Sequence, residues 1–277
     1  MEKGKLYVVA TPIGNLDDIT LRALKVLKEI DVIAAEDTRH TLKLLNHFKI
    51  TKPLISYHRH NEETKKNVLI DKLNSGQNIA LVSDAGTPGI CDPGEEVIKK
   101  AIEEQIEIIP IPGPCAFINA LICSGIDTKE FTFLGFLPLN KKLRKAKIEE
   151  IEKSSKTIII YEAPHKLKTT LVDLNNILKQ RKIVLARELT KIHEEFIRGT
   201  ISDIIKIQDD LKGEFVITIE GNSTVENAEN KLNELSLDEH YKFYEGQGME
   251  KKEIIKKIAK DRNVNKNEIY MKFLGTS

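Results

Sequence analysis

Short β-branched runs alternate in this chain with longer amphipathic stretches, and this alternation limits the fold more than any other feature of the sequence. Runs such as Val32–Ala35 and Ile79–Val82 are apolar throughout and predict buried strands. The stretch Leu21–Ile30 carries its apolar side chains at helical spacing. Strands that alternate with helices in this way predict an α/β fold, in which helices pack on a sheet.

The alternation runs through two successive segments of the chain. The first should contain the strands Leu6–Ala10, Val32–Ala35, Ile55–Tyr57, Ile79–Val82 and Ile106–Pro110, and the helices Leu21–Ile30, Thr38–Phe48, Glu62–Leu73 and Pro93–Glu104. The pattern restarts after Gly125 with the strands Thr132–Gly135, Thr157–Tyr161, Ile183–Ala186 and Glu214–Ile219, and the helices Lys141–Lys153, Leu167–Leu178 and Ile201–Leu211. We predict an α/β domain at residues 1–124, a second at 125–221, and at 222–277 a polar linker with two or three Lys-rich helices.

Composition narrows the class of protein. The formal net charge of +1 gives no whole-surface attraction to polyanions, so any nucleic-acid contact must use a local basic patch. The three cysteines form no CxxC pair, which argues against a disulfide framework and a zinc knuckle. The most apolar stretch, Ile106–Cys123, is broken by three prolines, and no secretory signal is visible. We expect a cytoplasmic protein without a membrane span.

Three glycine- and proline-rich loops follow predicted strands: Thr11–Leu16, Ser83–Gly89 and Pro112–Ala116. Ligands of open α/β sheets bind beyond the carboxyl ends of the strands, where glycine permits close backbone approach. Ordinary tight turns are the alternative explanation for these loops. Dinucleotide and P-loop fingerprints are absent, and Gly86 stands where a phosphatase loop needs its second carboxylate. The loops therefore predict a small-molecule site of another kind.

Seven segments in this order resemble the ribosomal RNA small subunit methyltransferase I family, within the tetrapyrrole methylase superfamily. They are Tyr7–Leu16, Ala34–Arg39, Ser83–Gly89, Ile111–Pro114, Tyr161–His165, Ala186–Lys191 and Lys212–Phe215. The resemblance covers essentially the whole chain. Two positions depart from the family pattern, because Cys91 and Cys115 stand where serine is expected.

The resemblance implies two α/β domains with S-adenosylmethionine in the cleft between them, and no metal. It further implies 2′-O-methylation of a cytidine in the decoding region of 16S ribosomal RNA in the small ribosomal subunit, by a homodimer. The expected cofactor-binding residues are Pro12, Gly14, Ser83, Asp84, Ala85, Gly86, Pro88, Pro112, Gly113, Cys115, Ala116, Tyr161 and Glu162. For Asp84, bracing of its own loop is an equal alternative.

A ribose hydroxyl is a poor nucleophile, so a proton acceptor or a nearby charge should help it attack. The catalytic candidates are Glu36, Asp37, Glu188 and Lys191. Asp37 is equally suited to cap the helix that starts at Thr38, and Glu188 and Lys191 also fit a local ion pair. The sequence does not choose the base among them.

Two basic runs could neutralise RNA phosphates. The first run contains Lys141, Lys142, Arg144 and Lys145, and the second contains Lys251, Lys252, Lys256, Lys257, Lys260 and Arg262. Arg39, which lies outside both runs, is a further candidate for contact with an RNA phosphate. A solvated helix face is the alternative for each run. Two other functions remain open at this point: a small-molecule tetrapyrrole methylase, and a non-catalytic factor that binds RNA during ribosome assembly.

Overall fold

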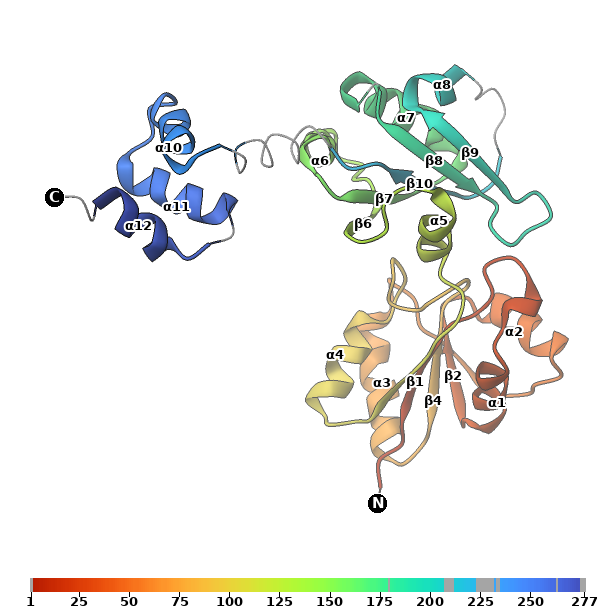
Figure 1. Ribbon diagram of the computed structural model, residues 1–277. Helices are drawn as coiled ribbons and strands as arrows, with labels where there is room; N and C mark the ends of the chain where they lie inside the picture. Colours follow the sequence, from red (N-terminus) through yellow and green to blue (C-terminus); the bar gives the residue numbers. More distant parts are fainter. Residues whose placement is uncertain are drawn as a thin grey trace. The chain divides into compact units, whose positions relative to one another are not determined.

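The computed structural model describes residues 2–178, 180–206, 212–222, 232, 235–262 and 264–274. The chain divides into two compact units, one of Met1–Ile148 and Thr157–Glu220 and one of Glu149–Lys156 and Gly221–Ser277. The first unit contains two five-stranded sheets, and the predicted α/β class with two sheet-containing halves is confirmed (Figure 1). Within the described part of the chain, no helix has the length and apolarity needed to cross a membrane.

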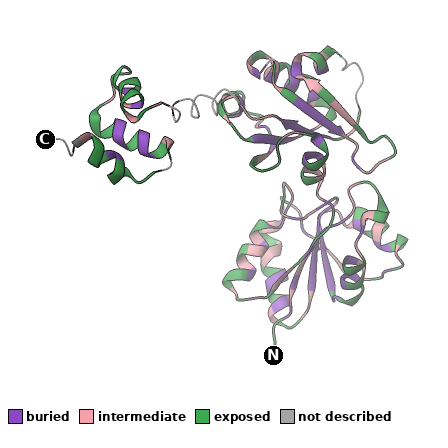
Figure 2. Ribbon diagram, viewed as in Figure 1, coloured by how far each residue is buried: buried purple, intermediate pink, exposed green. Residues whose placement is uncertain are grey.

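The first sheet is parallel, with the strand order β3-β2-β4-β1-β5. Its strands are β1 (Leu6–Val9), β2 (Val32–Ala35), β3 (Leu54–Ser56), β4 (Ile79–Val82) and β5 (Ile108–Ile111). All four residues of β2 and of β4 are buried (Figure 2), because helices cover both faces of the sheet. The topology brings the loops after β1, β4 and β5 to one edge of three adjacent strands.

The helices of this half divide between the two faces of the sheet. The cores show that α1 (Leu21–Glu29) and α2 (Thr38–His47) pack on one face, with α3 (Glu62–Asn74) and α4 (Glu95–Glu103) on the other. The prediction that Pro93 opens α4 is wrong, because Gly94 has a φ of +148° and is the N-cap. A Cβ at Gly94 would lie 3.0 Å from Leu81 Cδ2, so this turn packs directly on β4.

The second sheet is mixed, with the order β6-β7-β10-β8-β9. Its strands are β6 (Phe131–Phe136), β7 (Thr157–Glu162), β8 (Lys182–Arg187), β9 (Glu195–Thr200) and β10 (Phe215–Ile219). Helix α5 (Ala116–Ser124) packs on it through Ala120 and Leu121. The remaining helices are α6 (Lys141–Lys153), α7 (Pro164–Leu178) and α8 (Ile201–Lys206). Residues 207–211, which the sequence adds to the last helix, lie outside the described residues.

The second unit contains α10 (Leu237–Glu245), α11 (Lys251–Asp261) and α12 (Lys266–Leu274) around a core of Ile254, Ile255, Ile258 and Ile269. The predicted Lys-rich helices are therefore confirmed. Ser236 and Glu239 form a capping box at the start of α10. The predicted linker covers Asn222–Asn230, and its residues 223–230 lie outside the described residues.

Candidate active site

The three glycine- and proline-rich loops are tied to one another at the carboxyl edge of the first sheet. Thr11 N–H donates to Gly86 O at 2.8 Å, and Gly86 N–H donates back to Thr11 O at 3.0 Å. The Thr87 hydroxyl donates to Pro114 O at 3.1 Å. Gly86 has a φ of +82°, a conformation that favours glycine. These bonds fix the shape of the loops before any ligand arrives.

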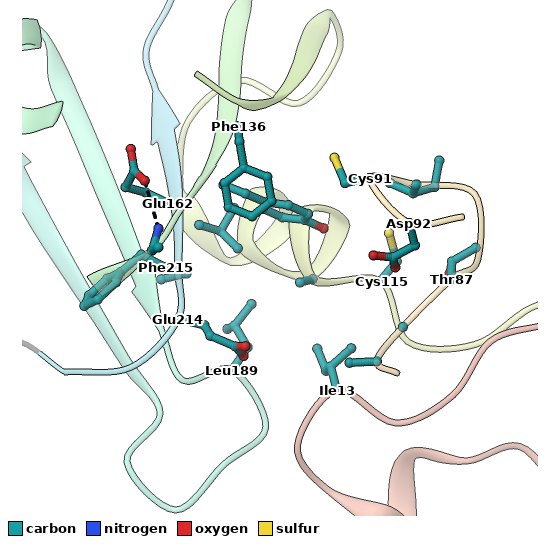
Figure 3. Close-up of a pocket in the computed structure, with 18 of the residues that line it drawn as sticks. Ile13, Thr87, Cys91, Asp92, Cys115, Phe136, Glu162, Leu189, Glu214 and Phe215 are labelled. Atoms are coloured by element: carbon teal, nitrogen blue, oxygen red, sulfur yellow. Dashed lines mark hydrogen bonds between the residues drawn. The ribbon is translucent and has the colours of Figure 1, made fainter. Parts of the chain in front are cut away.

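A cavity of about 450 Å³ lies beside these loops, and both halves of the first unit line it. Figure 3 shows Ile13, Thr87, Asp92 and Cys115 on one side, with Phe136, Glu162 and Phe215 on the other. The lining also includes Ala85, Gly86, Ile90, Cys91, Ala116, Tyr161, Ala163, Pro164, His165, Ala186, Leu189, Glu214 and Val216. Two strand-loop systems far apart in sequence therefore share one mainly apolar pocket.

Six of the expected cofactor-binding residues line the cavity: Ala85, Gly86, Cys115, Ala116, Tyr161 and Glu162. The other seven, Pro12, Gly14, Ser83, Asp84, Pro88, Pro112 and Gly113, are not among the lining residues. Some of these have a packing role instead. A Cβ on Gly14 would lie 2.4 Å from Lys191 Cγ, and one on Gly113 would lie 2.9 Å from Ala10 Cβ. Close approach of the backbone explains both glycines.

Asp84 and Glu36 brace the base of the site. The Asp84 carboxylate accepts from the Asp37 N–H at 2.9 Å, which ties the loop after β4 to the loop after β2. The Glu36 carboxylate accepts from the Asp84 N–H at 3.5 Å. Burial and the neighbouring Asp84 charge raise the pKa of Glu36. Asp84 therefore fits the alternative in which it braces its loop. Neither Asp84 nor Glu36 lines the cavity.

Asp37 and Arg39 interact locally. Asp37 is the N-cap of α2 and accepts from the Arg39 N–H at 2.8 Å, as the capping alternative predicts. Its carboxylate also binds the Arg39 guanidinium at 2.7 Å, and this bond holds the pKa of Asp37 well below its usual range. The Arg39 side chain is 88% exposed.

Glu188 and Lys191 form a local ion pair of 3.0 Å between the ends of β8 and β10. Glu188 also accepts from the Glu214 N–H at 2.9 Å, and Lys191 binds the Glu214 carboxylate at 3.0 Å. A Cβ on Gly213 would lie 2.4 Å from Glu188 Cγ, so glycine makes room for this pair. Neither Glu188 nor Lys191 lines the cavity.

Asp92 is a carboxylate in the cavity that the sequence analysis missed. Burial, followed by the charge of Glu36, raises its pKa to about 6, while the nearby Arg59 charge opposes this rise. The sequence held a signal, because Asp92 directly follows Cys91, one of the two departures from the family pattern. Phe136 and Phe215 were also missed, since both lie within strands and their sequence pattern is that of ordinary core residues.

The cavity has the size and the surface of a small-molecule site, for which volumes of about 300–1,000 Å³ are usual. Ile13, Ile90, Phe136 and Leu189 offer apolar surface to a nucleoside, and Ala85 and Gly86 leave room at the cavity wall because their side chains are small or absent. These residues fit S-adenosylmethionine. No group of three His, Cys, Asp or Glu side chains suited to a metal ion occurs among the described residues.

Comparison with known proteins identifies the family. A family model described as Tetrapyrrole (Corrin/Porphyrin) Methylases matches residues 5–205. A protein of Halalkalibacterium halodurans named Ribosomal RNA small subunit methyltransferase I is 52% identical over 272 residues, which cover 97% of this chain and 94% of the relative. The chain belongs to the ribosomal RNA small subunit methyltransferase I family. A relative of the same name from Bacillus subtilis is 49% identical, with coverage of 97% and 94%.

Solved structures support the fold of this methyltransferase I family member. A uroporphyrin-III C-methyl transferase from Thermus thermophilus complexed with S-adenyl homocysteine has a TM-score of 0.57 at 13% identity, covering 78% of this chain and 97% of that one. A diphthine synthase has a TM-score of 0.60 at 14% identity, with coverage of 78% and 90%. The predicted family, the predicted fold and the predicted cofactor class are confirmed.

Proposed function

We propose that this protein transfers a methyl group from S-adenosylmethionine to the 2′-hydroxyl of a cytidine ribose in the decoding region of 16S ribosomal RNA. The observation that supports this most strongly is the 52% identity, over nearly the whole of both chains, to a protein named Ribosomal RNA small subunit methyltransferase I. The small ribosomal subunit is then the macromolecular partner, in the cytoplasm. We also propose that the protein works as a homodimer and that its domains divide at residues 124 and 221.

The cofactor is proposed to bind in the cavity of about 450 Å³. Gly86 and Ala85 would let it approach the loop closely, because they carry no bulky side chain, and Cys115, Ala116, Tyr161 and Glu162 would complete its surroundings. The seven expected residues that do not line the cavity would act by shaping these loops. When bound, S-adenosylmethionine supplies an electrophilic methyl group on a sulfonium. The apolar lining excludes water from the place where the ribose oxygen must approach.

Among the carboxylates that line the cavity, Asp92 is the best-placed proton acceptor for the ribose hydroxyl. Glu162 is occupied, because it accepts from the Ala163 N–H at 2.9 Å and from the Thr170 hydroxyl. Glu214 holds Lys191 at 3.0 Å. Burial raises the pKa values of Cys91, Cys115 and Tyr161, so these groups stay protonated near neutral pH. The Ser83 hydroxyl and the Arg59 charge lower the pKa of Asp92, but burial outweighs both and keeps it raised.

The proposed step is a proton transfer coupled to methyl transfer. The Asp92 carboxylate would take the hydroxyl proton as the ribose oxygen attacks, while bound S-adenosylmethionine would supply the methyl group and retain the electron pair on sulfur. A carboxylate with a pKa near 6 is ionised at neutral pH yet more basic than an ordinary aspartate. Glu36, Asp37, Glu188 and Lys191 would then support the site without touching the reacting atoms.

The nature of the methyl acceptor tests this proposal. Full-length protein is incubated with labelled S-adenosylmethionine and either 30S subunits that lack the modification or a precorrin-type macrocycle. We expect label in the RNA of the subunits alone. Label only in the macrocycle would contradict the proposal and support a small-molecule methylase. Binding to 30S subunits with no calorimetric signal for the cofactor would instead support a non-catalytic assembly factor.

A further inference from the structure

A second cavity of about 550 Å³ lies between α6 and α7 in the first unit. Four basic residues line it: Lys141, Arg144 and Lys145 from α6, and Lys166 from α7. Thr169, Asp173 and Asn176 add polar groups, and Pro138, Leu139, Ile148 and Ile177 add apolar surface. We call this cavity the α6–α7 groove. It concentrates positive charge in a hollow of a chain whose net charge is only +1.

Arg144 fixes the groove rather than offering a free charge. Its Nε donates to the Asp173 carboxylate at 2.8 Å, and its Nη2 donates to the Thr170 hydroxyl at 2.7 Å. Its side chain is only 15% exposed. The guanidinium therefore joins α6 to α7 and holds the two walls of the groove in place.

Three lysines supply the charge that remains. Lys141, Lys145 and Lys166 have no acidic partner in the part of the chain that the structure describes, and all three belong to the groove lining. Asp173 is the one acidic residue of the lining, and Arg144 already neutralises it. An anion with several charges in a row would be stabilised by these ammonium groups, as a phosphodiester chain is.

The groove adjoins the cavity proposed to hold the cofactor. Phe136 lines the first cavity and Pro138 lines the groove, with the buried Leu137 between them. At the start of α7, His165 lines the first cavity, and the next residue, Lys166, lines the groove. Two separate chain segments thus contribute residues to the linings of both cavities.

The groove also has a feature that suits a nucleotide chain more than a simple anion. Leu139 is 77% exposed and lines the groove next to the lysines. Single-stranded RNA presents phosphates together with sugar and base faces, which bury well on exposed apolar side chains. Leu139 thus gives a sugar or a base an apolar contact beside the ammonium groups.

We infer that the α6–α7 groove binds the phosphodiester backbone of the RNA strand whose ribose enters the first cavity, through Lys141, Lys145 and Lys166. The inference rests on the proposed function for the identity of the RNA. It changes the RNA-binding residues expected from the sequence in three ways. Lys166 is added, Arg144 becomes a positioning residue, and Lys142 is left outside the groove.

The test compares two full-length variants that lose the same charge. The groove variant carries Lys141→Gln, Lys145→Gln and Lys166→Gln. The control variant carries Lys25→Gln, Lys28→Gln and Lys142→Gln, three exposed lysines that do not line the groove. Binding to 30S subunits is measured by sedimentation over a range of salt concentrations, along with cofactor affinity by calorimetry and methyl transfer.

We expect the groove variant to bind subunits at least about tenfold more weakly and to lose about 2 from the slope of log affinity against log salt, as loss of three phosphate contacts on a single strand requires. Cofactor affinity should be unchanged in both variants.

If the groove variant and the control variant bind subunits equally well, the inference is overturned. The proposed function would still stand in that case, provided that the wild-type protein methylates the subunits. Weaker binding with an unaltered salt slope would overturn it in favour of a protein contact. Wild-type protein that binds subunits without methylating them would refute the function alone, since the salt slopes still test the groove.

Discussion

At the scale of single residues, Asp92 lies between opposing electrostatic influences. Burial and the charge of Glu36 raise its pKa, and the charge of Arg59 lowers it. Arg59 is held in place by a hydrogen bond from its guanidinium to the Cys91 carbonyl. Such a balance is common where a carboxylate must act as a base near neutral pH.

Replacement of Asp92 by Asn should remove the proton acceptor and leave the shape of the cavity nearly unchanged. We expect the rate of methyl transfer to fall by about 10²-fold or more, as for loss of a general base. The calorimetric affinity for S-adenosylmethionine should stay within about twofold of the wild type. His165→Gln is the matched variant, because His165 is an exposed ionisable residue of the same cavity. A large loss of rate in His165→Gln with none in Asp92→Asn would transfer the role to the histidine.

The pH dependence of the wild-type rate should report the same carboxylate. Because the pKa of Asp92 is raised to about 6, its proton-accepting form is lost as the pH falls through about 6, and the rate should fall with it. Glu36→Gln removes a charge that raises this pKa, so the acidic limb should move to lower pH. Arg59→Gln removes a charge that lowers it, so the limb should move to higher pH. Disappearance of the limb in Glu36→Gln would assign it to Glu36 instead.

At the scale of loops and helices, Gly86 and Gly89 offer a matched comparison. Both have left-handed φ values, +82° and +81°. A Cβ at Gly86 would lie 3.2 Å from Ile13 Cγ2 at the cavity wall, whereas a Cβ at Gly89 would meet nothing within 4 Å. A side chain at either position would strain the backbone equally, but only a side chain at Gly86 would also crowd a neighbouring residue.

We therefore expect Gly86→Val to weaken cofactor binding at least about tenfold, since a β-branched side chain adds crowding to a left-handed strain of roughly 1–2 kcal/mol. Gly89→Val should have a thermal stability similar to that of Gly86→Val, but its affinity for the cofactor should be closer to that of the wild type. Calorimetry on the two folded variants makes the comparison. Equal affinities in both variants would remove the Gly86 turn from the binding site.

The buried contact between β7 and α7 depends on Thr170. Its hydroxyl donates to the Glu162 carboxylate and accepts from Arg144 at 2.7 Å. Thr170→Val keeps the shape but removes one hydrogen bond from Glu162 and one from Arg144, so the free energy of unfolding should fall by about 1–3 kcal/mol in denaturant titrations. Thr169→Val is the control, because this neighbouring threonine is exposed. Equal stabilities of the two variants would mean that the contact contributes nothing.

The sequence predicted best the strands that are buried on both faces of the sheet. Val32–Ala35 and Ile79–Val82 have the bounds of β2 and β4, because a strand covered on both faces must be apolar throughout. Strand β9 was missed, since it is an edge strand that contains Arg198 and Gly199 and pairs only with β8. Strand β9 forms because it pairs with β8, and the residue pattern of β9 alone does not indicate this pairing.

At the scale of the whole molecule, the candidate site is built from residues that lie far apart in the sequence. The sequence identified the three loops of the first sheet, because glycine and proline mark them locally. Asp92, Phe136 and Phe215 were not assigned to the site, since they line it only where the second sheet meets the first at the cavity, and the one local signal was the position of Asp92 next to Cys91. The same holds for the α6–α7 groove, where Lys166 joins Lys141 and Lys145 only through helix packing.

In the second unit, the sequence did not show which residues of the basic run Lys251–Arg262 have a structural role. Arg262 donates to His240 Nδ1 at 3.1 Å and to the Leu235 carbonyl, so it holds α10 and the segment before it. Lys257 lies 5.5 Å from the centre of the Tyr244 ring. Lys251, Lys252, Lys256 and Lys260 are exposed, and their proposed contact with RNA stays a prediction.

The position of the transferred methyl group tests the central claim most directly. Full-length protein is incubated with labelled S-adenosylmethionine and unmodified 30S subunits, and the extracted 16S RNA is digested with alkali and analysed by mass spectrometry. A 2′-O-methyl group protects the adjacent phosphodiester from alkali, so the account predicts label in an alkali-stable dinucleotide that begins with cytidine, and an initial rate of labelling about 10²-fold lower with Asp92→Asn. Label in single nucleotides, which places the methyl group on a base, would contradict it.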